Sequence, residues 1–466
     1  MLATIIKREI LDTILSPKFV FTFSVCAVLI LLSTFAGVLD YRTELAEYNA
    51  AVALNKNNLE SQANYMTLAG IGTKITRPPQ VLSVISTGIQ GATGRRATVN
   101  IAYDPSLVDS KYSSNPVLAI FGELDLTLIV KIVLSLFAIL FTYDSISGER
   151  ERGVLKLNLS YNIPRDKLIL GKAVGLFTIF LITITIPLLL HVIILQLSPD
   201  ISLDAEDWLR IGMMFISFLL YTSIFFTLGV LISTLTNRSA GSLFVLLCSW
   251  VLIIIIIPKV SVLLARQINP IPSVHQVTAE KDAYLLEIQS STMQQVNDWR
   301  QANPADSTPD FQEKFKQFLT DLQNDSVRRI ETKNAEVEEE FQGKRRRQQI
   351  LALNLSRISP AAGLAFSTMS LAKTGLEEQE RFLNSIKTYK PIFSQWANTK
   401  MMANLDMSGK SEMPKPDLSD MPQHDFRPQA FKDSLLLALP DLAIMALMAL
   451  LFAMGAFVAF IRYDVR

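Results

Sequence analysis

Residues 243–264 read LFVLLCSWVLIIIIIPKVSVLL, and their centre, residues 251–257, is an aliphatic run without a polar side chain. A helix needs about 20 mostly apolar residues to cross roughly 30 Å of hydrocarbon at about 1.5 Å per residue. This stretch is long enough and apolar enough to cross. We therefore predict that it is a transmembrane helix.

Other stretches meet the same requirement and bring the predicted spans to six. They cover residues 19–38, 126–143, 168–197, 208–235 and 435–461. The composition agrees, because 50% of the 466 residues are hydrophobic and the mean hydropathy is +0.30, more apolar surface than a soluble core needs. The predicted fold class is an α-helical polytopic membrane protein.

Basic residues near the predicted span ends set the orientation, because they concentrate in short cytoplasmic loops. The loop at 198–207 carries acidic residues and no Lys or Arg, whereas the loop at 144–167 is rich in both. We therefore expect both ends of the chain, including the tail at 462–466, on the cytoplasmic side. The first span could also be a signal peptide, but it is longer than a usual signal region and lacks a clear small-x-small cleavage site, so we expect an uncleaved anchor.

The first long segment that this orientation places outside is 39–125. It opens with a polar, helix-favouring stretch at 41–65 that could continue the first span as a helix. Residues 97–103, ATVNIAY, alternate in the manner of a half-buried strand. We expect a small mixed α/β domain.

The second long outer segment is 265–434, for which we expect a larger helical domain. Helical spacing at 278–299 and at 311–356, with proline breaks between them, predicts a helical hairpin. The apolar stretch at 361–372 is too short to span, so it either lies along the outer membrane surface or packs against the spans.

Motifs of catalysis are missing from the sequence. The nearest approach to the nucleotide-binding pattern GxxxxGK[ST] is SGKS at 408–411, where Asn404 stands in place of the first glycine. Neither GxSxG nor HExxH occurs, and the 3 histidines stand far apart without metal-ligand spacing. With 44 basic and 43 acidic residues, the chain also has no charge footprint for nucleic acid. We expect no catalytic residue, no metal site and no nucleic-acid partner.

A charged segment in the loop at 144–167 lies between two glycines. It comprises Gly148, Glu149, Arg150, Glu151, Arg152 and Gly153. Because glycine permits sharp changes of backbone direction, the segment could form a compact helix that is presented to a soluble partner. The surrounding sequence is DSISGERERGVL at 144–155, followed by Pro164-Arg165 and by Gly171-Lys172.

This order resembles the signature loop of ABC-2 type permeases, D-x-I-x-x-E-x-E-x-G-T-L, which precedes a P-R segment and a G-K at the next span. Val154 stands where Thr is common. The resemblance implies the permease subunit of an ABC exporter in the bacterial cytoplasmic (inner) membrane. It also implies that the segment Gly148 to Gly153 couples the chain to ABC ATPase subunits. Two such ATPase subunits would bind ATP and Mg. Two permease chains, identical or paralogous, would pair with each other. This chain itself would need no cofactor.

Residues 1–18, before the first span, predict an amphipathic elbow helix. Leu2, Ile6 and Ile10 recur four residues apart on one side, with Arg8 roughly opposite. Pro17 ends this helix, which is suited to lie in the inner membrane interface and brace the loop. The resemblance to ABC-2 permeases implies such a helix as well.

A second functional class explains the large outer segments equally well. A membrane receptor or assembly scaffold would use its outer helical domain to bind a partner, for example in the periplasm, and would move nothing. A secondary transporter would instead have repeated hydrophobic halves with broken helices and buried ionisable groups, which the sequence lacks. The expected function is the exporter permease.

Overall fold

The computed structural model describes residues 2–101, 104–114, 124–160, 164–303, 309–403 and 415–462. The SGKS sequence and most of the tail at 462–466 lie outside these residues. The chain divides into two compact units. We call Met1–Ile255 with Ser359–Arg466 the main body, and Ile256–Ile358 the hairpin unit.

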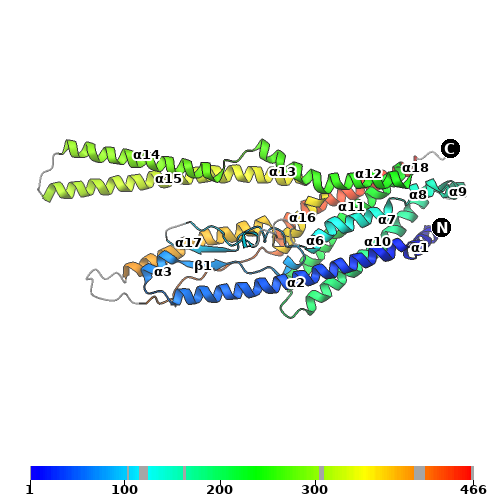
Figure 1. Cartoon of the computed structure of the whole chain (residues 1–466), viewed down its shortest axis with the longest axis horizontal. Helices are drawn as coiled ribbons and strands as arrows, with labels where there is room; N and C mark the ends of the chain where they lie inside the picture. Colours follow the sequence, from blue (N-terminus) through cyan, green and yellow to red (C-terminus); the bar gives the residue numbers. More distant parts are fainter. Residues whose placement is uncertain are drawn as a thin grey trace. The chain divides into compact units, whose positions relative to one another are not determined.

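Six helices in the described residues are long and apolar enough to cross a membrane, which confirms the predicted fold class (Figure 1). Each overlaps one predicted span. They are α2 (Pro17–Glu60); α6 (Leu126–Ile129) with η2 (Val130–Leu134), α7 (Ser135–Thr142) and α8 (Ser147–Glu151); α10 (Arg165–Leu197); α11 (Ala205–Leu235); α12 (Ser239–Val251) with η3 (Leu252–Ile256) and α13 (Ile257–Ile268); and α18 (Phe431–Ile461).

Helix α2 begins at Pro17, and the Ser16 hydroxyl before it accepts a hydrogen bond from the Phe19 N–H. The helix runs unbroken for 44 residues. At about 1.5 Å per residue this is about 66 Å, roughly twice the thickness of the hydrocarbon core. The predicted continuation of the first span is confirmed, and it ends at Glu60.

Helices α7, α10, α12 and α18 contact α11, whose Phe218, Tyr221 and Phe225 are fully buried. The Tyr221 hydroxyl donates a hydrogen bond of 2.7 Å to the carbonyl oxygen of Lys131 in η2, a π-helical turn. A π-helical turn disturbs the regular hydrogen-bond ladder. Because lipid offers no hydrogen-bond donor, a buried tyrosine is a suitable partner for the carbonyl oxygen.

Helix α16 (Pro360–Ala372) settles the position of the apolar stretch at 361–372. Its Leu364, Thr368 and Leu371 are fully buried, and the helix packs against α11 and α18. Of the two predicted positions, the one against the spans is therefore confirmed.

Arg210 on α11 joins this helix to the segments beside it and is fully buried. Its guanidinium group donates hydrogen bonds to the carbonyl oxygens of Leu371 at 3.1 Å and Gln429 at 2.6 Å, and to the Ser434 hydroxyl at 2.8 Å. One side chain thus holds the end of α16 and the start of α18 against α11.

A second core joins parts of both predicted outer segments. Strands β1 (Thr73–Thr76) and β2 (Arg96–Val99) pair antiparallel, and α3 (Tyr65–Ile71) precedes them. Helix α17 (Leu376–Ala403) buries Phe382 and Phe393 against these elements. We call the part of α2 beyond residue 40, these elements, η1 (Val81–Val84), α4 (Lys111–Ser114) and residues 415–430 the α2–α17 domain.

The sequence-based division of the second outer segment is wrong in one respect, since residues 265–434 do not form a single helical domain. The predicted helical hairpin is confirmed as α14 (Val274–Ala302) and α15 (Pro309–Ser356), which lie in the hairpin unit with a seam that includes Ile288 and Val337. Helices α16 and α17 instead bury their apolar faces in the main body. The charge pattern predicted the helices but not the core that each one joins.

Candidate site at the loop between α7 and α10

The loop with the charged segment folds at the end of the spans where α1 begins and α18 ends (Figure 1). Helices α8 and α9 (Val154–Ser160) are separated by Arg152 and Gly153, and Gly153 has a φ of 75°, a conformation that favours glycine. A small apolar core lies beneath the loop, built by Ile146, Leu155, Leu168, Ile169 and Phe460, with Ile5 of α1 (Leu2–Ile14) against it. This core fixes the loop to α1, α10 and α18.

Glu149 is paired with a buried lysine of the following span. Its Oε1 lies 2.6 Å from Nζ of Lys172 on α10, and Oε2 of Glu9 on α1 lies 3.5 Å from the same nitrogen. The Lys172 side chain is 7% exposed. Burial raises the pKa of the Glu9 carboxyl, and the Lys172 ammonium opposes that rise. Lys172 therefore links α1 and α8 to the span α10.

Two glycines on either side of Lys172 let α1 come close to α10. A Cβ atom on Gly171 would lie 2.7 Å from Cγ2 of Ile5, and one on Gly175 would lie 2.8 Å from Cβ of Glu9. Both distances are shorter than real Cβ contacts. The pair has the small-xxx-small spacing with which helices approach each other closely in membranes. It places Glu9 within reach of Lys172.

Arg150 and Glu151 bind the ends of the two helices that meet beside the loop. Nη1 of Arg150 donates to the Thr236 carbonyl oxygen at 2.7 Å, and Nη2 donates to that of Thr234 at 2.9 Å, at the C-terminal end of α11. Oε2 of Glu151 accepts hydrogen bonds from the N–H, at 3.0 Å, and the hydroxyl of Ser239, the first residue of α12. A cation at a helix C-terminus and an anion at a helix N-terminus both suit the helix dipole.

The exposed surface of the loop is formed by other residues. Arg152, Lys156 and Leu157 are exposed, and 57% of the Leu157 surface faces outward. Nε of Arg152 donates a 3.1 Å hydrogen bond to the carbonyl oxygen of Gly148 in α8, the helix that it follows. A soluble partner can therefore reach this second set more easily than Glu149 or Arg150, which are half-buried.

Residues 3–465 match the model of the family described as ABC-2 family transporter protein. The chain belongs to this family. A search among curated proteins found no match. The match confirms the predicted resemblance along nearly the whole chain, and the ABC-2 protein has the multi-pass helical body expected of a membrane component of a transporter.

The amphipathic helix predicted over residues 1–18 is formed as α1, with its contact face turned slightly from the predicted one. Ile6 and Ile10 are half-buried, as are Ile5 and Glu9, while Leu2 is 40% exposed. Arg8 is exposed and pairs with Asp12 one turn later, at 3.6 Å. Ile5 and Glu9 contact α10 in addition to the predicted face.

Lys172, Glu9 and the two glycines were not assigned to the site by the sequence analysis. The sequence GKAVG at 171–175 carried the signal, because a lysine inside a span is costly unless it faces protein or water. Within the described part of the chain, no group of three or more His, Cys, Asp or Glu residues lies close enough together to hold a metal ion.

Proposed function

We propose that the chain is the membrane-spanning permease subunit of an ABC exporter. In this proposal both ends of the chain are cytoplasmic, in a bacterial inner membrane, and two permease chains, identical or paralogous, assemble with two ABC ATPase subunits. The ATPases bind ATP and Mg. Their movement is passed to the spans through α8 and its charged residues, Glu149 to Arg152.

The observation that carries the proposal is the attachment of α8 to three spans at once. Glu149 contacts α10 through Lys172, Arg150 contacts the end of α11, and Glu151 contacts the start of α12. Charges that served only to orient the chain in the membrane would need no such partners. A force on α8 would reach these helices through the polar contacts, as the coupling of a soluble motor to membrane helices requires.

The exposed residues Arg152, Lys156 and Leu157 are the surface that we assign to the ATPase. An apolar side chain that is 57% exposed and directly follows Lys156 in the sequence fits a contact with a soluble partner better than a surface that only faces water. Replacing Leu157 by Asp should weaken the complex without opening the apolar core beneath the loop.

The test is to co-express the full chain with candidate ABC ATPases and to purify the complex. We expect a stable complex for the unchanged chain and its loss for Leu157→Asp. The matched control is Val327→Asp on α15, where the valine is 47% exposed and lies outside the loop. Equal retention of the ATPase by both variants would contradict this surface, and absence of any ATPase complex would favour the receptor or scaffold function.

A further inference from the structure

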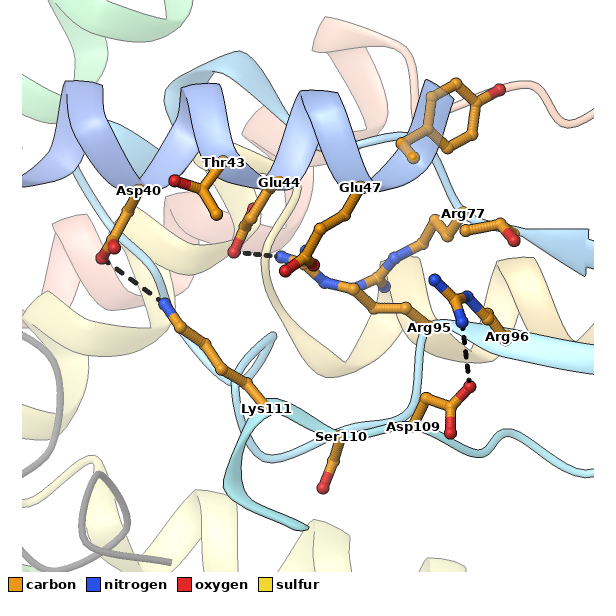
Figure 2. A pocket seen from close by; sticks show the side chains of 12 residues that line it. Asp40, Thr43, Glu44, Glu47, Arg77, Arg95, Arg96, Asp109, Ser110 and Lys111 are labelled. Carbon is orange, nitrogen blue, oxygen red and sulfur yellow. Dashed lines mark hydrogen bonds and ion pairs between the residues drawn. The ribbon is translucent and has the colours of Figure 1, made fainter. Parts of the chain in front are cut away.

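A pocket of about 470 Å³ lies in the α2–α17 domain, at the end of this domain nearest the first span. One wall is the face of α2 that carries Asp40, Glu44 and Glu47 (Figure 2). The opposite wall includes Arg77, beside β1, and Arg95, beside β2. The volume falls within the range of about 300–1,000 Å³ that is usual for small-molecule sites.

Three cations of this pocket are paired with acids of its walls. Arg95 Nη2 lies 2.5 Å from Glu44 Oε1, and Lys111 Nζ lies 3.4 Å from Asp40 Oδ2. The third pair joins Arg96 Nη1 to Asp109 Oδ2 at 3.4 Å. Figure 2 shows these pairs as dashed lines around the pocket. The two charges of each pair neutralise each other, so these three pairs favour neither a cationic nor an anionic ligand.

Arg77 is the exception among the cations of the pocket. Its side chain is buried, with 3% exposed, and among the described residues its Nη2 atom has no hydrogen-bond partner and no carboxylate forms an ion pair with it. In Figure 2 its side chain extends into the pocket toward the wall formed by α2. Burial lowers the pKa of Arg77 to about 10, and repulsion from Arg95 adds to this effect, while the carboxylates of Glu378 and Glu44 oppose it, so the group remains charged near neutral pH. A buried charge without a partner is costly, which favours an anionic group of a ligand.

Glu47 is the corresponding exception among the acids. It lines the pocket on α2, is exposed, and forms no ion pair within the described residues. Oε2 of Glu44, on the same face, is buried and also lacks a hydrogen-bond partner in this part of the chain. The pocket thus offers one unpaired cation in its interior and one unpaired carboxylate on the exposed part of its wall.

We propose that this pocket binds a small zwitterion with the chemistry of a free amino acid, whose carboxylate pairs with Arg77 and whose ammonium group pairs with Glu47. A planar guanidinium group suits a carboxylate because it can donate two parallel hydrogen bonds. A ligand with a single charge would satisfy one of the two unpaired groups and leave the other. Binding requires only the folded α2–α17 domain and is independent of ATPase coupling.

The test uses the full chain in detergent and measures its melting temperature with each of the protein amino acids added singly. We expect at least one of them to raise the melting temperature. Its methyl ester and its N-acetyl derivative should not, since each lacks one of the two charges. No shift with any amino acid at saturating concentration would overturn the proposal, as would equal shifts with the derivatives.

Substitutions then locate the site by titration with the amino acid that binds. Glu47→Gln should weaken binding at least about tenfold while leaving the fold intact, because Glu47 is exposed and unpaired. Arg77→Met should weaken binding at least as much, and an unchanged circular dichroism spectrum would show that it folds. The matched control is Glu287→Gln, an exposed carboxylate on α14 in the hairpin unit. Binding that survives both pocket substitutions, or is lost in the control, would overturn the assignment.

Discussion

Replacing Glu149 by Ala should destabilise the protein where α1, α8 and α10 meet. Oε1 of Glu149 lies 2.6 Å from Nζ of Lys172, whose side chain is 7% exposed. Removing one member of a fully buried ion pair costs about 3–5 kcal/mol, because the other charge loses its partner. Here Glu9 remains at 3.5 Å and the Glu149 side chain is 17% exposed, so we expect a smaller loss of about 2 kcal/mol.

The amide variant separates the charge from the hydrogen bond. Glu149→Gln keeps an oxygen that can accept a hydrogen bond from Lys172, so we expect a loss of about 1 kcal/mol. Arg152→Ala is the matched control, because Arg152 is a charged residue next to the same helix and donates to the Gly148 carbonyl oxygen. Its effect should stay within about 0.5 kcal/mol.

Two measurements are needed, one for stability and one for coupling. The melting temperature of the purified chain can be measured by size-exclusion chromatography after heating. It should be highest for Arg152→Ala, lower for Glu149→Gln and lowest for Glu149→Ala. Lys172→Met should also lower it, since Glu9 and Glu149 would then face each other without a cation. Adding Glu149→Gln to that variant should recover part of the loss, with an interaction energy of at least about 1 kcal/mol.

ATP hydrolysis by the ATPase complex, measured below the lowest melting temperature, then reports coupling in folded protein. We expect Glu149→Gln to lower transport-stimulated hydrolysis more than Glu287→Gln does, because Glu287 is an exposed carboxylate on α14, outside the loop and its assigned ATPase surface. An unchanged melting temperature for Glu149→Ala would refute the stabilising role of the ion pair. Equal hydrolysis by Glu149→Gln and Glu287→Gln would refute the coupling role.

Three further predictions concern other parts of the main body and the orientation of the chain. Gly175→Val should displace α1 and lower stability by about 1–3 kcal/mol, because the new Cβ atom would overlap Glu9. Faster proteolysis near residue 15 would report the displacement. The control is Gly241→Val, because a Cβ atom there meets nothing within 4 Å. Arg210→Met should cost about 3 kcal/mol, since buried carbonyl oxygens lose their donor, and a melting temperature equal to that of the exposed control Arg300→Met would contradict this. In a Cys248→Ala background, Ser106→Cys and Ser290→Cys, both at exposed positions, should react with an impermeant maleimide in intact cells. Reaction only after permeabilisation would contradict the proposed orientation.

The spans could be predicted because the property that makes them is local. An apolar stretch as long as 243–264 has only one favourable environment, whatever the rest of the chain does. The continuation of α2 to Glu60 was also predictable, because its polar residues favour a helix and no proline interrupts them. These predictions depend on neighbours along the chain and not on packing.

The division of the outer segments could not be predicted in the same way. Helix α17 lies in the sequence beside the hairpin, yet Phe382 and Phe393 join a core with Leu68 and Val99 from the first outer segment. A helical pattern shows that a helix has an apolar face, but it does not show which other face covers it. That information resides in contacts between residues far apart in the sequence.

The same limit applies to the candidate site. Glycine and charge spacing predicted a short helix at the loop, and α8 is formed there between Ser147 and Glu151. The partners of its charges could not be read from the loop, because Lys172 follows Glu149 by 23 residues and the carbonyl groups near Thr236 follow Arg150 by more than 80. The loop sequence is the same whether its charged side chains face solvent and bind a partner or face inward and form pairs within the chain.

The alternation of sign in Glu149, Arg150 and Glu151 has a structural reason. Arg150 meets the carbonyl end of α11, and Glu151 meets the amide end of α12, so each sign fits the helix dipole at its own position. Moving α8 alone would break these hydrogen bonds and the Lys172 pair, at a cost of about 0.5–1.5 kcal/mol for a neutral bond and more for a charged one. Moving α8 together with the turn between α11 and α12 would keep the hydrogen bonds of Arg150 and Glu151, and would strain only the pair of Glu149 with Lys172 on α10. If an ATPase pushes on the loop, as we propose, the less costly response is therefore a joint movement of α8 and these helix ends.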